Sequence, residues 1–266
     1  MRPALIASLI AFSAIVPAGY VLANHHEAAD DAISTAVSAD SRTPAYTERD
    51  VYRHPAETLA FFGVQPGQTV FEYAPGGGWY SEILGPLLSA KGTFYAAAPA
   101  GKYYDMIAKK VSDEPSKYGQ VKLMSWPLAE GAVAPGSVDT VLTFRNVHNL
   151  VMNGSAPAAF STFYEMLKPG GTLGVVDHRL PEDRDSAQEK ASGYVKTSTV
   201  RKLAEDAGFV LEAQSEINAN PKDSANWEKG VWTLPPVLRN GETDREKYLA
   251  IGESDRMTLR FRKPAS

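Results

Sequence analysis

Apolar runs of strand length alternate with helical patterns along most of the chain from residue 53 onward. The strand-like runs cover residues 69–73, 92–97, 121–124, 138–144, 172–177, 210–217 and 257–262. Helical periodicity predicts helices over residues 53–63, 80–88, 102–111, 157–167 and 197–207. Mostly apolar strands separated by helices indicate a parallel sheet that is covered on both faces. The pattern therefore predicts a doubly wound α/β fold.

The C-terminal part of the chain has a different pattern. Met257, Leu259 and Phe261 alternate with polar residues, which predicts a strand at an edge of the sheet. The polar segment 218–255 before it contains three prolines and two tryptophans and lacks clear helical periodicity. We interpret this segment as an excursion that lies over the sheet edge.

The N-terminal residues have the pattern of an export signal. Arg2 precedes an apolar run over residues 4–16, and residues 21–23 (Val-Leu-Ala) form a small-x-small cleavage site. We predict a signal peptide over 1–23, a flexible leader over 24–44 and a domain over 45–266. A retained membrane anchor is the alternative. Cleavage implies a periplasmic or secreted protein without stable membrane insertion.

Length, charge and cysteine content narrow the functional classes. The chain has 266 residues, 44% of them hydrophobic, which suits one globular domain with a sizeable core. A formal net charge of −4 without a basic stripe argues against a nucleic-acid partner. The chain contains no cysteine, so disulfide bonds and thiol catalysis are excluded.

The segment 70–80 carries the first candidate chemistry. A short strand containing Glu72 leads into a turn with Gly76, Gly77 and Gly78, and a helix follows directly. Glycines let the backbone approach a ligand closely, and a helix N-terminus directs N–H groups at it. This arrangement predicts a site for a nucleotide-like cofactor.

At this point the chain resembles the class I S-adenosylmethionine-dependent methyltransferases over residues 69–263. The likeness rests on the order and spacing of three motifs: Glu72-x-Ala74-x-Gly76-x-Gly78, the strand at 136–142, and the reversal Lys168-Pro169-Gly170-Gly171. Residues 53–55 and 75–80 are also similar to a group of exported, uncharacterised predicted methyltransferases.

The resemblance implies a Rossmann-like, mostly parallel sheet with an antiparallel last strand. It implies that the activity is methyl transfer from S-adenosylmethionine to an unidentified small molecule. The methionine end of that cofactor would be held by the loop residues Glu72, Ala74, Gly76, Gly77 and Gly78.

Two positions depart from the family pattern. Ala98 stands where an acidic residue usually contacts the ribose, and Trp126 lies where an acidic residue usually approaches the adenine. Stacking of Trp126 on adenine and packing under a loop both remain open. These departures support an alternative, a non-catalytic ligand-binding module on a degenerate methyltransferase fold. A nicotinamide-dependent oxidoreductase is a third hypothesis, which the turn at 168–171 disfavours.

Candidate catalytic residues follow the carboxyl ends of the strands, where ligands bind in open α/β sheets. His148 and His178 are candidate bases, and Tyr80 is placed to overhang the sulfonium; for each, structural packing is the competing interpretation. Arg179 is a possible clamp for an anionic substrate or a surface ion-pair partner. Asp177 and His178, as strand neighbours, should face opposite sides, so we predict no metal site formed with His148.

Overall fold

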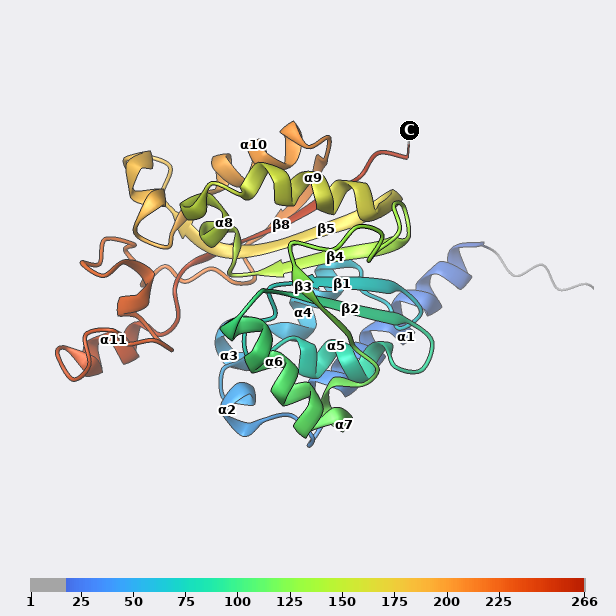
Figure 1. Ribbon diagram of the computed structural model, residues 1–266. Helices are drawn as coiled ribbons and strands as arrows, with labels where there is room; N and C mark the ends of the chain where they lie inside the picture. The colour runs from blue at the N-terminus through green and yellow to red at the C-terminus, as the bar shows by residue number, and fades with distance from the viewer. Residues whose placement is uncertain (1–17, 266) are drawn as a thin grey trace, which may run out of the picture.

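The computed structural model describes residues 18–265, with side chains from residue 28 onward (Figure 1). Its centre is a twisted eight-stranded sheet. The strands are β1 (Thr69–Tyr73), β2 (Thr93–Pro99), β3 (Lys122–Trp126), β4 (Val138–Phe144), β5 (Leu167–Leu180), β6 (Val195–Lys196), β7 (Val210–Ser215) and β8 (Arg256–Arg262). The order is β3-β2-β1-β4-β5-β8-β7, with β6 paired to β5. Only β8 runs antiparallel to its neighbours, so the predicted doubly wound, mostly parallel sheet is confirmed.

Helices cover both faces of the sheet, as the alternating sequence pattern requires (Figure 1). One face carries α8 (Val147–Asn153), α9 (Ala156–Met166) and α10 (Thr197–Asp206), whose apolar side chains form a core with β4, β5 and β8. The other face carries α1 (Ala18–Val37), α4 (Pro55–Phe62) and α5 (Ser81–Leu88), with a second core. Beside it lie α2 (Pro44–Thr47), α3 (Asp50–Arg53), α6 (Lys102–Asp113) and α7 (Pro115–Tyr118). The long strands β4 and β5 are buried between these layers.

The last strand does not lie at the edge of the sheet, so that prediction is wrong. β8 pairs with β5 on one side and with β7 on the other, and β7 is the edge strand. The polar face of β8 is satisfied inside the protein, because Thr258 accepts a hydrogen bond from Asn218 and Arg256 contacts Glu253. Arg256 and Thr258 are buried with hydrogen-bond partners, so the alternation of apolar and polar residues in this strand does not indicate an exposed edge.

The predicted flexible leader is also corrected, because residues up to 37 belong to helix α1. Ala29, Ile33 and Ala36 of this helix are buried, and α1 packs against α4 and α5. The small alanines allow a close approach, so few large apolar residues are needed to order the segment. Residues 1–17 of the predicted signal peptide lie outside the described part of the chain.

The segment 218–255 forms a lobe beside the carboxyl ends of the parallel strands (Figure 1). It contains a 3-10 turn, η2 (Gly230–Thr233), and the helix α11 (Arg245–Ile251). A second 3-10 turn, η1 (Ser186–Lys190), lies before β6. Within residues 18–265 no helix combines the length and apolar character that a membrane crossing needs.

Candidate functional site

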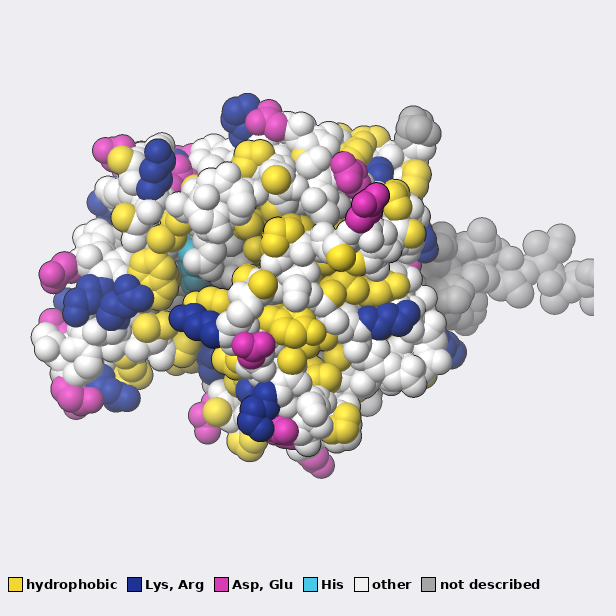
Figure 2. All heavy atoms as spheres, in the orientation of Figure 1, with side chains coloured by type: hydrophobic (Ala, Val, Ile, Leu, Met, Phe, Trp, Pro, Cys, Tyr) yellow, Lys and Arg dark blue, Asp and Glu magenta, His cyan; other side chains and the backbone are white. Residues whose placement is uncertain are grey.

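Two adjoining cavities lie beyond the carboxyl ends of β1, β2 and β4. One cavity, of about 390 Å³, runs from the glycine loop to the 218–255 segment. The other, of about 470 Å³, extends past the end of β2. The two share Ala74, Gly76, Tyr103, Asn146 and Asn149, so they form one continuous site. Figure 2 shows a histidine side chain in a hollow of this face. We call them the inner cavity and the outer cavity.

The loop after β1 opens toward both cavities at one glycine. Gly76 has φ +59°, and a Cβ built there meets nothing within 4 Å. Ala74 has φ +54°, which is an uncommon conformation for a residue with a side chain. Its backbone N–H donates to the carbonyl oxygen of Ala97, and this bond fixes the start of the loop. The resulting backbone cradle suits a ligand that lies against Gly76.

The other two glycines of the loop serve packing. A Cβ on Gly77 would lie 2.7 Å from the hydroxyl oxygen of Tyr46, and one on Gly78 would lie 2.8 Å from the ring of Tyr118. Tyr46 donates to the carbonyl oxygen of Gly77 at 2.7 Å, which pins the loop. Gly77 lines the inner cavity, whereas Gly78 lines neither cavity. Gly78 is therefore required by the contact with α7, a feature of the tertiary structure that the motif does not contain.

Glu72 lies at the floor of the inner cavity and is 2% exposed. Burial raises the pKa of its carboxyl group to about 7, and the hydroxyl of Ser81, which donates at 2.5 Å, offsets part of this rise. A buried carboxyl group without a cationic partner of its own is suited to receive a positively charged ligand group.

Of the two residues that the resemblance places near the adenosine portion of the cofactor, Ala98 lines the outer cavity and Trp126 does not. Ala98 at the end of β2 lines it together with Pro99 and Met152, so its wall is mostly apolar at this point. Trp126 does not line either cavity. Its ring packs against Tyr73, with ring centroids 4.9 Å apart, and against Phe163 at 5.6 Å. Trp126 is therefore a packing residue of the core in this structure.

Asn146 joins the two strand ends that form the site. Its side-chain amide donates to the carbonyl oxygens of Ala74 at 2.9 Å and Phe144 at 3.0 Å. The loop after β1 is thereby tied to the end of β4. No sequence signal indicated that this asparagine bridges to a loop 72 residues away.

His148 is oriented by Asp177. The carboxylate of Asp177 accepts the backbone N–H of His148 at 2.8 Å and lies 2.8 Å from ring atom Nδ1. A carboxylate is an acceptor, so Nδ1 carries the proton and Nε2 is left as an acceptor, free of hydrogen bonds to other described residues. His148 lines the inner cavity. The helix α8, which places this ring, was not predicted.

His178 lines the same cavity, and its ring centroid lies 5.0 Å from that of His148. Its Nδ1 atom is 2.5 Å from the hydroxyl oxygen of Ser254. Burial lowers the pKa of His178 well below 6.5, and the nearby charge of Arg145 lowers it further. His178 is therefore neutral at physiological pH.

Asp177, His148 and His178 are gathered in space, so the opposite-face argument against their meeting is wrong. Their potential ligand atoms lie within 4.8 Å of one another. The carboxylate of Asp177 extends beyond the end of β4 and reaches the start of α8, which brings His148 to it. The group is better suited to proton transfer than to a metal. Asp177 already accepts three N–H groups, and the charges of Arg145, Arg256 and Arg53 act on His178.

Tyr80 is a packed residue at the cavity wall. Its ring stacks on Phe144, with centroids 3.5 Å apart and ring planes 11° apart. Its hydroxyl donates to the backbone carbonyl oxygen of Arg53 at 3.4 Å. Burial raises the pKa of Tyr80 above its usual value. The tyrosine therefore helps to position Arg53, with its hydroxyl group directed into the fold.

Three arginines that the sequence reasoning did not single out line the inner cavity: Arg49, Arg53 and Arg145. Arg179, which it did consider, does not line either cavity. Arg179 forms ion pairs with Asp255 at 2.8 Å and Glu216 at 2.7 Å, so the surface ion-pair interpretation describes its position. The only sequence signal for Arg53 was its place before His54 and Pro55 in the segment similar to the exported group.

No protein-family model and no curated protein matches the chain. Solved structures do. A S-adenosylmethionine-dependent methyltransferase from Aquifex aeolicus aligns with a TM-score of 0.58 at 16% identity, over 88% of this chain and 98% of that one. The chain has the fold of these methyltransferases.

Two further structures show the range of activities on this fold. An arsenic(III) S-adenosylmethionine methyltransferase from Chlamydomonas reinhardtii aligns with a TM-score of 0.53 at 15% identity, over 88% of this chain and 73% of that one. The cyclase SpnF aligns with a TM-score of 0.58 at 14% identity, over 91% of this chain and 97% of that one. The fold is therefore shared by proteins of different activity, and the activity must be argued from the site.

Proposed function

We propose that the protein is a S-adenosylmethionine-dependent methyltransferase that acts on a small molecule. One observation carries the proposal: Gly76, where the loop is open, and His148, which Asp177 orients from behind, line the same cavity. A cofactor cradle and a candidate base thus share one cavity. The methyltransferase fold of the structural neighbours supports this assignment.

The residues of the loop after β1 fit the cofactor. The cradle at Gly76 leaves room for the methionine portion, and Glu72 offers a carboxylate to its ammonium group. The outer cavity, with Ala98, Pro99 and Met152, offers apolar surface to the adenosine portion. When bound, S-adenosylmethionine supplies an electrophilic methyl group on a positively charged sulfur.

His148 is the proposed general base. Asp177 holds the ring so that Nε2 is the acceptor, and Nε2 takes the proton of the methyl acceptor. Asp177 also stabilises the imidazolium that forms, in the way a buried carboxylate stabilises the histidine of a catalytic triad. The neutral ring of His178 lies beside it without adding a second positive charge.

The 218–255 segment is proposed to exclude water from this chemistry. Val231, Trp232 and Pro235 of this segment also line the inner cavity. The ring of Trp232 lies edge-on to His148, with centroids 6.4 Å apart. A cover of apolar side chains strengthens electrostatic interactions within the site and limits access of water to it.

The first test is calorimetric titration with S-adenosylmethionine and, separately, S-adenosylhomocysteine. We expect a dissociation constant below about 100 μM for at least one of them, about −5.5 kcal/mol. Absence of heat and of a thermal shift with both ligands would contradict the methyltransferase assignment. It would then favour a ligand-binding module that has lost cofactor recognition at Ala98.

Export remains a proposal of its own. Helix α1 runs from Ala18 to Val37 across the proposed cleavage point after Ala23. Its buried residues Ala29, Ile33 and Ala36 all follow that point, so cleavage would leave their contacts in place. We expect intact-mass measurement of the protein recovered from the periplasm or medium to show a chain that begins at Asn24. A full-length chain retained with the membrane would contradict cleavage.

A further inference from the structure

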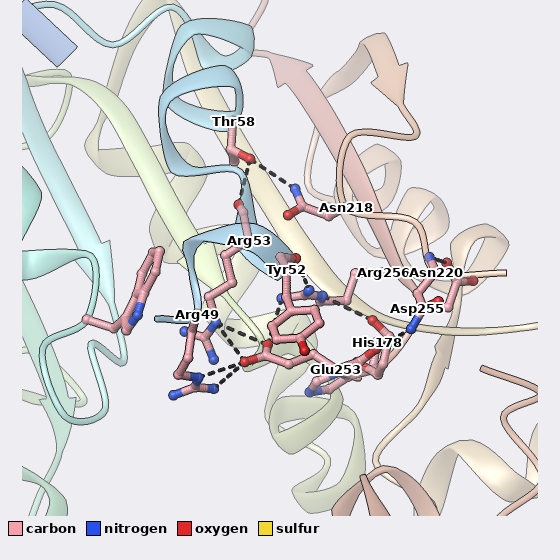
Figure 3. A network of polar contacts seen from close by, with 12 residues as sticks. Arg49, Tyr52, Arg53, Thr58, His178, Asn218, Asn220, Glu253, Asp255 and Arg256 are labelled. Atoms are coloured by element: carbon pink, nitrogen blue, oxygen red, sulfur yellow. Dashed lines mark hydrogen bonds and ion pairs between the residues drawn. The ribbon is translucent and has the colours of Figure 1, made fainter. Parts of the chain in front are cut away.

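An excess of positive charge lies along one side of the inner cavity. Arg49, Arg53 and Arg145 line it, and we call these three residues the arginine wall. Figure 3 shows Arg49, Arg53 and Arg256 around Glu253. Together the four guanidinium groups are arranged around one carboxylate, Glu253. Burial alone would raise the pKa of Glu253, but Arg53 and its neighbours lower it to about 2. Glu253 is therefore ionised, and its negative charge is already shared by the surrounding arginines.

All three arginines of the wall have a buried donor atom without a hydrogen-bond partner among the described residues; for Arg49 this atom, Nη2, forms an ion pair with Glu253 at 2.7 Å instead. Nη2 of Arg53 and Nε of Arg145 are buried without a hydrogen-bond partner among the described residues. Arg53 as a whole is 5% exposed. By contrast, the guanidinium of Arg256 donates to the carbonyl oxygens of Tyr52 and Ser254 and contacts Glu253 at 3.2 Å. Buried charged donors without acceptors are costly unless a ligand satisfies them.

Both groups are held in place by neighbouring residues. The guanidinium of Arg53 lies 4.7 Å from the ring centroid of Trp79, and its Nε is 3.1 Å from a carboxylate oxygen of Glu253. Arg145 has φ +60°, and its backbone N–H donates to Val176 at 2.7 Å. A left-handed conformation at a residue with a side chain is strained and is often found at ligand sites. The wall is therefore preorganised, which favours a specific ligand.

The cofactor does not balance this charge. S-adenosylmethionine carries a sulfonium and an ammonium group against one carboxylate, so its binding adds net positive charge to the cavity. Near the wall, Asp177 is engaged by His148 and Glu253 by the arginines. Glu72 is the one carboxylate among the residues that line the inner cavity, and the proposed function assigns it to the ammonium group of the cofactor. An anion on the second ligand, the methyl acceptor, would therefore balance the charge of the wall.

We propose that the arginine wall binds an oxyanion, a carboxylate or a phosphate, on the small molecule that is methylated. This inference rests on the proposed methyltransferase function. Guanidinium groups bind such anions through paired, charge-assisted hydrogen bonds. His148 lines the same cavity, so an acceptor held by its anionic group presents its nucleophile in the cavity that the base also lines. The substrate class is thus a small anionic molecule with a second, protonated nucleophilic group.

Inorganic phosphate and acetate are the probes for this site. We expect phosphate or acetate to raise the melting temperature of the intact chain above its value in chloride at equal ionic strength. The anion that gives the larger rise in melting temperature shows whether the site prefers a phosphate or a carboxylate. Arg145→Gln should weaken the apparent affinity for phosphate or acetate about tenfold or more. Arg145→Lys, which retains the positive charge, should show a smaller loss. Arg201→Gln, which removes a guanidinium from the exposed face of α10, is the matched control and should change nothing.

A second arm separates the acceptor from the cofactor. With S-adenosylhomocysteine at saturation, the stabilisation by phosphate or acetate should persist. Competition between the two ligands would mean that the wall holds the cofactor carboxylate, and it would overturn the proposal. So would equal anion stabilisation in Arg145→Gln and the unmodified chain. The titration with S-adenosylhomocysteine alone judges the methyltransferase function, so failure of either proposal is seen separately.

Discussion

The two sides of the inner cavity are built in different ways. The glycine side, with Glu72, Ala74 and Gly76, comes from five consecutive positions of one strand and turn. The arginine wall joins α3 and the end of β4, and it is centred on Glu253, about 200 residues from Arg53. One side carries a buried acid and an open backbone, and the other carries unsatisfied cations. A motif that is local in sequence thus faces a binding surface that only folding assembles.

The largest effect is expected from removing the charge at the centre of the arginine wall. Glu253→Gln leaves buried guanidinium groups to repel one another, and we expect the free energy of unfolding to fall by about 3–5 kcal/mol. Urea denaturation measures this change. Glu216→Gln, at an exposed pair with Arg179, is the control and should cost less than about 1 kcal/mol. Equal effects in the two variants would mean that the wall is not a buried network.

The glycine side should give the protein a distinct pH dependence. The pKa of Glu72 is raised from 4.5 to about 7 in the folded state, so the folded chain holds this proton more tightly than the unfolded chain. Its contribution to stability is full below pH 4.5 and is lost as the pH rises through about 7, a decrease of about 3 kcal/mol.

Glu72→Gln isolates this contribution. His178, whose lowered pKa acts in the opposite direction, is present in both proteins, so the difference between them reports Glu72. Denaturation at about pH 5 and about pH 8 should show the wild-type chain losing stability relative to the variant. A constant difference across this range would show that Glu72 is ionised throughout, for example through a cation that the site retains.

Binding at the glycine side is tested by a pair of matched glycines. Gly76 and Gly136 have φ +59° and +62°, and a Cβ at either position meets nothing within 4 Å. Only Gly76 lines the cavities. Valine imposes similar backbone strain at both positions, but Gly76→Val should weaken S-adenosylhomocysteine binding at least about a hundredfold, or about 2.7 kcal/mol. Similar losses in both folded variants would place the ligand elsewhere.

The smallest effect is expected at Trp126. Because its ring packs on Tyr73 and Phe163 outside both cavities, Trp126→Phe should cost about 1 kcal/mol of stability. Calorimetric affinity for S-adenosylhomocysteine should change less than about twofold. A large loss of affinity in a stable variant would revive the stacking interpretation that the sequence left open.

Seven strands and five helices were predictable because their signals are local. The two-residue strand β6 was not predicted, and β5 begins at Leu167, five residues before the predicted start. Gly63, which ends α4 at φ +71°, marked a helix stop. The predictions for the leader and for the last strand were wrong because tertiary contacts, which the local pattern does not contain, determine the structure of these two segments. Helix α1 is buried through small alanines, and β8 is an inner strand because Asn218 and Glu253 satisfy its polar face.

In the candidate site, too, residues with a local sequence pattern were predicted and residues that depend on tertiary contacts were not. Glu72, Gly76 and His148, which line the inner cavity, were singled out from the sequence because the strand ends that carry them have a recognisable pattern. Arg53 and Arg145 were not singled out, because an arginine in sequence does not show whether it is paired.

The sequence alone determined the α/β class, the doubly wound arrangement and the glycine cradle, because these follow from periodicity and backbone freedom within a few residues. Only the tertiary structure decided that Asp177 and His178 both reach His148, that Gly78 serves packing, and that the cavity is rich in positive charge. The physical reason is that burial, pairing and pKa depend on what surrounds a side chain. Those surroundings come from segments far apart in the chain.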